Sequence, residues 1–361
     1  MRAFLNPAVE RTDDFRGLFA DEDYRDVHGY FAAHPELPPS PLRTLTSIAS
    51  SAGVGRIDAK DESHRFGVNA FKIVGVRYAV HRIGDAAARR GLVCATAGNH
   101  GRAVARVARQ KHVPCTVFIP AAGQLTNTEQ RTRTARLAAM RADDATVFEV
   151  EGTYENAVRR AAEYGRETGA TIVSDTSWEG YEQIPRWIMA GYTQIFEEAH
   201  SQWDAPPDVA LIQGGVGGLV CAAASWFAWR FGAARPFLIA CEPENAACLF
   251  ESARAGRLTT LEGRLDTIMA GLRCAEPSPA AWPAIRSGID AFVTVDDGIA
   301  LEAMGALAAG RLEERIEAGP SGACGAAALI ALAGAPALAE VRRACGLDRS
   351  TRTFIVVTEG A

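Results

Sequence analysis

Short β-rich runs alternate with helical stretches along most of this chain, and the alternation restricts the possible folds more than any other feature. Strands that alternate with helices form parallel sheets packed between helices, so the predicted fold class is α/β. The predicted strands are residues 56–58, 92–95, 115–119, 146–150, 171–174, 209–213, 237–242, 292–295 and 354–358. The predicted helices are 100–110, 126–140, 154–168, 182–201, 219–231 and 298–310.

The spacing of these runs indicates two domains. Four predicted strands fall between residues 92 and 174, and a long helical stretch follows before the strand pattern resumes near residue 209. We therefore predict a small inserted α/β domain at 80–183, and a large domain made of 1–79 plus 184–361. A chain of 361 residues is long enough for two domains that each bury a core.

Composition narrows the class of protein. The net charge of −5 argues against a nucleic-acid partner, because such proteins usually carry a basic surface. Residues 1–14 have mixed charges and no apolar run, so we expect no secretory signal. Two uncharged stretches, 209–229 and 318–339, contain several glycines and suit buried loop-and-helix units better than membrane spans.

The eight cysteines include no Cys-x-x-Cys pair and no Cys/His cluster with zinc spacing, so no metal site is predicted. Reduced, buried thiols are typical of a cytoplasmic protein. We therefore expect a cytoplasmic protein that binds neither membrane nor metal.

Lys72 is the first candidate for chemistry. It follows Phe71 and precedes Ile73 and Val74, close to Asn69, which is a good N-cap residue. In the first turn of a helix, the helix dipole and the apolar surroundings would both favour the neutral amine. A neutral amine can form a Schiff base with an aldehyde, whereas the alternative is an ordinary surface lysine.

A glycine-rich run, Gly214-Gly215-Val216-Gly217-Gly218, lies between a predicted strand and a predicted helix. Its backbone N–H groups at a helix start would suit a phosphate. No Gly-Lys-Ser/Thr follows, and a dinucleotide site would place its glycines after the first strand of the domain. Tight packing of the strand against the helix remains the alternative interpretation.

Three further loops follow predicted strands, at the sheet edge where ligands bind in open parallel sheets. The loop from Thr96 to Gly101 offers N–H groups for a carboxylate, and its Asn99 offers a neutral amide for a phenolate oxygen. His100 in that loop can titrate, or can equally be a capping or core residue. Asp175 can carry a proton or cap a helix, and Thr358 can hydrogen-bond a heteroaromatic nitrogen or simply be a strand residue.

Taken together, these features describe pyridoxal 5′-phosphate (PLP) with an amino-acid substrate. A lysine for the aldehyde, a phosphate loop, a carboxylate loop and a neutral partner for a ring nitrogen are each only suggestive. Their combination in one chain predicts a PLP enzyme.

The chain resembles the diaminopropionate ammonia-lyases, within the tryptophan synthase β-like (fold type II) PLP-dependent enzymes. The resemblance runs from about residue 37 to the end of the chain. It implies two domains, each with a mainly parallel twisted sheet flanked by helices, and an active site in the cleft between them. The matching segments are residues 60–63, 65–67, 69–72, 98–102, 175–181, 184–185, 187–189, 242–243, 268–272, 276–277, 321–323 and 358–360.

The resemblance also implies an activity and residue roles. The expected reaction is PLP-dependent α,β-elimination on L-2,3-diaminopropionate or a similar amino acid, which gives aminoacrylate and then pyruvate and ammonia. A cytoplasmic homodimer is expected. Lys72 and Asp175 resemble the catalytic residues of the family. The expected cofactor-binding residues are Lys72, Phe71, Asn99, Gly214, Gly215, Val216, Gly217, Gly218, Glu242 and Thr358, and the expected substrate-binding residues are Thr96, Ala97, Gly98, His100 and Ser321.

Two positions depart from the family pattern. Ala97 replaces an aspartate that is credited with deprotonating the D-isomer of the substrate, and Pro320 replaces an acidic residue before Ser321. These departures leave three alternatives open. The protein can be a serine or threonine dehydratase, a β-replacement synthase, or a catalytically silent protein that binds an amino acid, because a fold does not guarantee its activity.

Overall fold

The computed structural model describes residues 1–96, 98–121, 127–152, 154–311 and 314–361. The chain divides into two compact units. Unit 1 comprises residues 1–71 and 192–361, and unit 2 comprises 72–191. Helix α3 (Lys72–Ile83), which the sequence places mostly in the large domain, belongs to unit 2 because it packs against α5 (Asn99–Gln110).

Unit 1 contains a seven-stranded sheet with the order β1-β10-β9-β8-β11-β3-β2. The five inner strands are parallel, and the two edge strands pair antiparallel. The inner strands are buried over most of their length, as expected for parallel strands covered on both faces. The strands are β1 (Ala3–Leu5), β2 (Leu42–Thr44), β3 (Arg56–Asp61), β8 (Val209–Gln213), β9 (Phe237–Pro243), β10 (Ala291–Val295) and β11 (Arg352–Val357).

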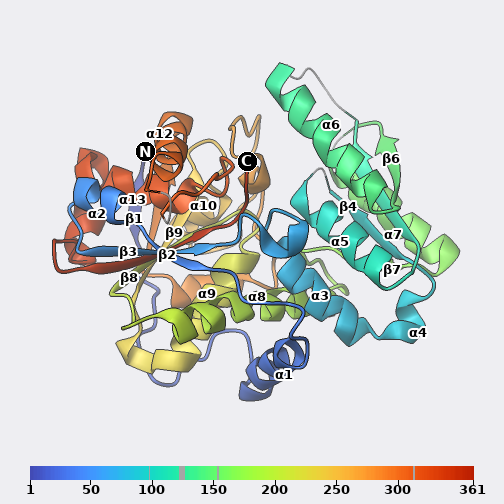
Figure 1. The fold of residues 1–361 in the computed structure, drawn as a ribbon, viewed down its shortest axis with the longest axis horizontal. Helices are drawn as coiled ribbons and strands as arrows, with labels where there is room; N and C mark the ends of the chain where they lie inside the picture. The colour runs from blue at the N-terminus through green and yellow to red at the C-terminus, as the bar shows by residue number, and fades with distance from the viewer. Residues whose placement is uncertain (97, 122–126, 153, 312–313) are drawn as a thin grey trace. The chain divides into compact units, whose positions relative to one another are not determined.

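Helices cover both faces of this sheet (Figure 1). One face packs Val209, Leu211 and their counterparts on neighbouring strands against α2, α12 and α13. The opposite face packs against aromatic residues of α8 and α9, such as Phe196 and Phe227, both of which contact Phe354. The helices are α1 (Asp21–Ala32), α2 (Thr46–Ala52), α8 (Gln183–Gln202), α9 (Gly218–Phe231), α10 (Cys248–Ala255), α11 (Trp282–Gly288), α12 (Asp297–Ala308), α13 (Cys324–Gly334) and α14 (Ala339–Ala344).

Helices α9 and α13 account for the two uncharged stretches of the sequence. Nearly all their residues are buried in unit 1, so neither helix has a polar face. Within the described ranges, no single helix combines the length and apolar character needed to cross a membrane. One pair, Cys324–Gly334 and Pro336–Ala344, meets those criteria only when joined across a 96° bend.

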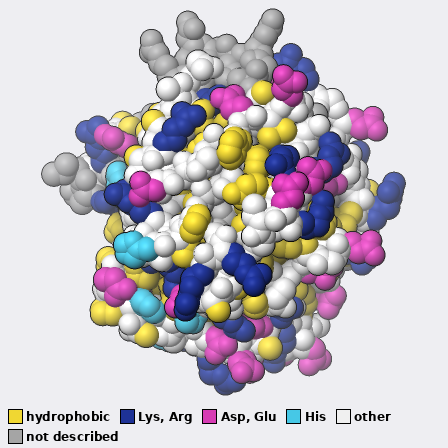
Figure 2. All heavy atoms as spheres, turned by 90° about the vertical axis from the view of Figure 1, so that its right-hand side faces the viewer, with side chains coloured by type: hydrophobic (Ala, Val, Ile, Leu, Met, Phe, Trp, Pro, Cys, Tyr) yellow, Lys and Arg dark blue, Asp and Glu magenta, His cyan; other side chains and the backbone are white. Residues whose placement is uncertain are grey.

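Unit 2 contains a four-stranded parallel sheet with the order β6-β5-β4-β7. Its core joins Val93, Ala95 and Phe118 of the sheet to Ala157 and Ala161 of α7. On the face of the molecule in Figure 2, the described acidic and basic side chains are interspersed. The elements are β4 (Leu92–Ala95), β5 (Cys115–Pro120), β6 (Thr146–Val150), β7 (Thr171–Ile172), α3, α4 (Asp85–Ala88), α5, α6 (Asn127–Ala142) and α7 (Tyr154–Thr168).

All nine predicted strands are present, and the α/β prediction is confirmed. The sequence did not reveal the edge strands β1 and β2, which have three residues each. Strands this short cannot display an alternating pattern, and they form because a neighbouring strand offers unpaired backbone groups.

A buried network of charges fixes the segment that leaves β3. Arg65 Nη1 donates to Glu198 Oε2 of α8 at 2.8 Å, and Lys60 Nζ lies 3.0 Å from the same oxygen. Glu62 lies beside Arg65, with 3.6 Å between Arg65 Nε and Glu62 Oε2. Burial lowers the pKa of Lys60, although Glu198 and Glu62 oppose the effect. The network therefore ties the chain between β3 and α3 to α8.

We predict that Arg65→Met destabilises the protein by about 3–5 kcal/mol, because removing one partner leaves the carboxylates of Glu62 and Glu198 with insufficient buried positive charge. Urea unfolding followed by circular dichroism measures the change. Asp204→Asn is the control, since Asp204 pairs with Arg56 but is mostly exposed, and it should change stability by no more than about 0.5 kcal/mol. Equal costs for the two variants would contradict the prediction.

Candidate active site

Lys72 and Asp175 form an ion pair within unit 2. Lys72 is the first residue of α3, and Asp175 follows β7. The distance from Lys72 Nζ to Asp175 Oδ2 is 2.6 Å, and the two side chains are 20% and 16% exposed. The structure therefore brings together the two residues that were predicted to be catalytic, although they lie 103 positions apart in the sequence.

Two details of the Lys72 prediction are corrected. Lys72 does lie in the first turn of a helix, but Asn69 is not the N-cap, because α3 begins three residues later. Asn69 instead has a φ of +60°, a left-handed conformation that asparagine tolerates better than most residues. The second correction concerns the charge of Lys72: the Asp175 carboxylate lies 2.6 Å from its Nζ, and this ion pair requires the charged amine, not the neutral amine expected from the sequence.

Asp175 is an anion in the folded protein. Burial would raise the pKa of its carboxyl group, but the positive charge of Lys72, with a contribution from His100, outweighs burial and holds the pKa well below its usual range. Asp175 therefore stays ionised at any pH at which the ion pair with Lys72 is intact.

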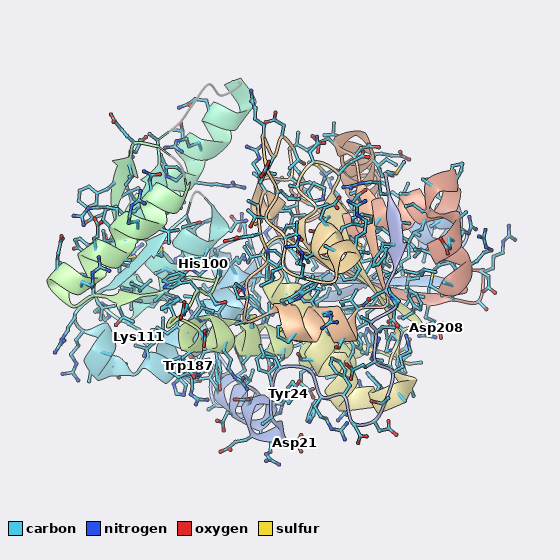
Figure 3. The ribbon with its side chains drawn as sticks, turned by 180° about the vertical axis from the view of Figure 1, so that it is seen from behind. Asp21, Tyr24, His100, Lys111, Trp187 and Asp208 are labelled. Atoms are coloured by element: carbon cyan, nitrogen blue, oxygen red, sulfur yellow. The ribbon has the colours of Figure 1, made fainter. Side chains whose placement is uncertain are left out.

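His100 of α5, labelled in Figure 3, lies near Asp175. Its Nε2 lies 2.8 Å from the carbonyl oxygen of Val173, which can only accept, so Nε2 carries the hydrogen. Its Nδ1 lies 3.8 Å from Asp175 Oδ2 and has no hydrogen-bond partner among the described residues. His100 is therefore a core residue, as one of the two interpretations from the sequence expected, and its ring is also oriented toward the ion pair.

The loop before α5 leaves a helix start available to a ligand. Thr96 Oγ1 accepts a hydrogen bond from Gly98 N at 3.1 Å, and Asn99 is the first residue of the helix. No side chain of the described residues caps α5 at Gly98. Backbone N–H groups at such a helix start suit a carboxylate. Ala97, predicted to bind the substrate, lies outside the described residues.

In unit 1, the glycine loop connects β8 to α9. Gly217 has a φ of +95° and occupies the N-cap position of α9, where no side chain of the described part provides a cap. A Cβ atom at Gly214 would lie 2.4 Å from Leu249 Cδ1, and one at Gly217 would lie 2.5 Å from Ile285 Cδ1. Tight packing thus accounts for these glycines, and it also presents an uncapped helix start of the kind that binds phosphate.

Glu242, near the end of β9, positions α10 against this loop. Its two carboxylate oxygens accept hydrogen bonds from Leu249 N at 2.8 Å and Phe250 N at 2.7 Å, at the start of α10. Leu249 packs against Gly214 and Gly217. Burial raises the pKa of Glu242 to about 8, although the two N–H groups oppose the effect. Glu242 therefore acts on the loop through α10.

Thr358 lies at the end of β11, beside a residue that the sequence interpretation missed. Gln213 Nε2 donates to Thr358 Oγ1 at 3.0 Å. Gln213 is buried as the last residue of β8, and its one signal in the sequence is a polar side chain that ends an apolar strand. Phe71 N donates to the carbonyl oxygen of Thr358 at 3.0 Å, so the chain reaches Lys72 directly after a contact with β11.

Ser321 is tied to its neighbours in unit 1. Its hydroxyl oxygen accepts from Gly271 N at 3.0 Å, and its own N–H donates to Glu359 Oε1 at 3.1 Å. Its side chain therefore joins the loop before α13 to the segment around Gly271.

The donor set fits PLP. Lys72 offers the amine for the aldehyde, the start of α9 offers N–H groups for the phosphate, and Thr358 offers a neutral hydroxyl for the ring nitrogen. Among the described residues, no group of three or more His, Cys, Asp or Glu side chains could hold a metal ion.

Gly217→Ala should lower stability, because the left-handed conformation alone costs a non-glycine residue about 1–2 kcal/mol and the added methyl group would also overlap Ile285. Thermal unfolding of the protein without cofactor measures this cost. The matched control is Gly305→Ala in α12, where the added Cβ meets open space and a gain of up to about 1 kcal/mol is expected. A Gly217→Ala protein as stable as the control would contradict the account of the loop.

The raised pKa of Glu242 predicts a pH-dependent stability. Between its ordinary value of 4.5 and about 8, the folded protein keeps the proton that the unfolded chain has released. The contribution of Glu242 to stability is therefore fully present below about pH 4.5 and is lost as pH rises toward 8, by up to about 1.4 kcal/mol per pH unit. Glu242→Gln should remove this slope in urea unfolding between pH 5 and 8, and identical slopes in the two proteins would contradict the prediction.

Comparisons with known proteins agree with this geometry. Residues 34–345 match the family model described as "Pyridoxal-phosphate dependent enzyme". Diaminopropionate ammonia-lyase from Salmonella typhimurium strain LT2 is 32% identical, over 92% of this chain and 88% of the relative. The enzyme of that name from Escherichia coli strain K12 is 30% identical, over 89% of this chain and 84% of the relative.

A solved structure extends the similarity to the fold. The crystal structure of diaminopropionate ammonia lyase from Escherichia coli, in complex with an aminoacrylate-PLP azomethine reaction intermediate, superposes with a TM-score of 0.87. The superposition covers 99% of this chain and 93% of the chain in that crystal structure, and the two sequences are 28% identical. The chain therefore belongs to the pyridoxal-phosphate dependent enzymes of fold type II, in the family of the diaminopropionate ammonia-lyases.

Proposed function

We propose that the protein is a PLP-dependent ammonia-lyase that performs α,β-elimination on L-2,3-diaminopropionate, giving aminoacrylate and then pyruvate and ammonia. The observation that carries the proposal is the 2.6 Å contact between Lys72 Nζ and Asp175 Oδ2, in a chain of this family. Bound PLP supplies an electron sink that weakens the C–H bond at the substrate Cα.

Most of the predicted site residues have a role in this proposal. Lys72 would attach the cofactor through its amine, and its Nζ would accept the proton from the substrate Cα. The loop from Gly214 to Gly218 holds the phosphate, Thr358 holds the ring nitrogen and Asn99 holds the ring hydroxyl. Thr96, Gly98 and the backbone N–H of His100, at the start of α5, would hold the α-carboxylate of the substrate.

Asp175 provides the substrate preference. A partly buried carboxylate attracts a cation strongly and a neutral group weakly, as the 2.6 Å contact of Asp175 with the Lys72 amine illustrates. The β-amino group of diaminopropionate is a cation when it is protonated, whereas the hydroxyl groups of serine and threonine are neutral. Asp175 would hold the ammonium until the Cβ–N bond breaks and the nitrogen departs as ammonia with the bonding electron pair. The negative charge of Asp175 therefore favours the ammonia-lyase over the dehydratase alternative.

We propose a cytoplasmic homodimer, the state that the family resemblance implies. No disulfide joins the cysteines in the described part of the chain, and six of the eight are buried, which supports a reducing compartment.

The proposed preference predicts how Asp175→Asn changes selectivity. The wild type with PLP should turn over L-2,3-diaminopropionate with a kcat/KM at least about 100-fold above that for L-serine. In Asp175→Asn, kcat/KM for diaminopropionate should fall by about 10²–10⁴-fold while that for serine falls much less, because only the former loses a charge contact. Pyruvate formation, coupled to lactate dehydrogenase, measures both values.

Lys72→Ala is the companion variant in the same assay. It should lack the visible absorbance band of attached PLP and form no pyruvate from either substrate. Parallel reactions with the D-isomer, L-threonine and O-acetylserine, with and without added thiols, test the dehydratase and β-replacement alternatives. The proposed function would be wrong if serine or threonine were the better substrate of the wild type, or if no substrate were turned over.

A further inference from the structure

Gln213 is positioned where three segments of unit 1 meet. It ends β8, next to β11, and its side chain is 3% exposed. Its Nε2 atom lies 2.8 Å from the carbonyl oxygen of Val356 and 3.0 Å from Thr358 Oγ1. The carbonyl oxygens of Ser321 and Gly322 are slightly farther, at 3.2 and 3.3 Å.

The chemistry of these neighbours fixes the orientation of the amide. Three of the four are carbonyl oxygens, which can only accept, so the group that faces them must be the NH₂. Rotating the amide would place Gln213 Oε1 against those carbonyl oxygens. Gln213 therefore donates to Thr358, and Thr358 Oγ1 accepts.

This direction determines what the Thr358 hydroxyl can offer a ligand. A hydroxyl has one hydrogen and accepts through its lone pairs. Gln213 occupies one of its two lone pairs, so the hydroxyl keeps its hydrogen to donate and has one lone pair fewer with which to accept. The nearby protein acceptor is the carbonyl oxygen of Ser321, at 3.4 Å, which is long for an O–H···O bond. A ligand acceptor at normal distance would compete well for that hydrogen.

We propose that Gln213 is a positioning residue that keeps Thr358 a hydrogen-bond donor, so that the ring nitrogen of PLP is bound in its unprotonated form. The inference rests on the proposed function, because it assumes that Thr358 meets the ring nitrogen. A neutral ring withdraws fewer electrons than a protonated one, and this limits reactions such as transamination that need the stronger electron sink. Gln213 would thus help to restrict the chemistry to elimination without touching cofactor or substrate.

Removing the amide donor tests this role. In Gln213→Met, which keeps the volume of the side chain, the Thr358 hydroxyl can turn its hydrogen to a carbonyl oxygen of the protein and accept from the ring nitrogen. We expect the ¹⁵N NMR signal of holoenzyme reconstituted with ring-¹⁵N PLP to move from the unprotonated toward the protonated position. The pH at which that signal titrates should rise.

A double-mutant cycle separates this role from simple support of the fold. In a Thr358→Val background there is no hydroxyl for Gln213 to orient, so Gln213→Met should cause little further movement of the signal. A residue that only holds the loop at Ser321 and Gly322 would move the signal by a similar amount in both backgrounds. That result, or an unchanged signal in the single variant, would overturn the inference.

Two further outcomes keep the test decisive. If Gln213→Met does not fold, Gln213→Glu keeps the shape and replaces the donor with an acceptor, and it should move the signal in the same direction. If the wild type binds no PLP or forms no product, the proposed function itself fails. A wild type that is loaded and active but whose ¹⁵N signal is insensitive to both Gln213 variants refutes only the role of Gln213.

Discussion

The ion pair between Lys72 and Asp175 is the contact on which the rest of the account depends. It places an amine and a carboxylate 2.6 Å apart with limited solvent exposure, where their interaction is stronger than it would be in water. The charged amine must release its proton before it can attach an aldehyde, and the carboxylate can then hold a different cation. His100 adds an imidazole nitrogen that faces the same carboxylate. The proposed reaction follows from these three groups.

Around this pair, much of the structure serves to fix backbone rather than to supply functional groups. The segment that leads to Lys72 contains two non-glycine residues with positive φ, Phe66 and Asn69, which are costly conformations. The buried charges of Lys60, Arg65 and Glu198 hold the start of that segment. In the same way, Glu242 accepts a hydrogen bond from the backbone at the start of α10, and α10 packs against the glycine loop. In both arrangements, buried polar groups hold the backbone that carries predicted site residues.

The sequence predicted the fold well where the signal is local. Strand–helix alternation identified the nine main strands, and the glycine run between β8 and α9 marked a helix start without a side-chain cap. The sequence could not show which distant groups meet. Glu198 and Gln213 gain their importance from contacts with Arg65 and Thr358, which are 133 and 145 positions away, and no local pattern encodes those contacts. The N-cap at Asn69 was wrong for a related reason, because residues 69–71 pair with residues 358–360, which follow β11, and the helix begins only after this pairing.

The central claim is that Lys72 is the residue that carries the cofactor. The most direct test is to reduce the PLP-loaded wild-type protein with borohydride, digest it and locate the attached pyridoxyl group by peptide mass spectrometry. The account predicts a single modified peptide with the group on Lys72. Modification of another lysine, such as Lys60 or Lys111, with Lys72 unmodified, would contradict it.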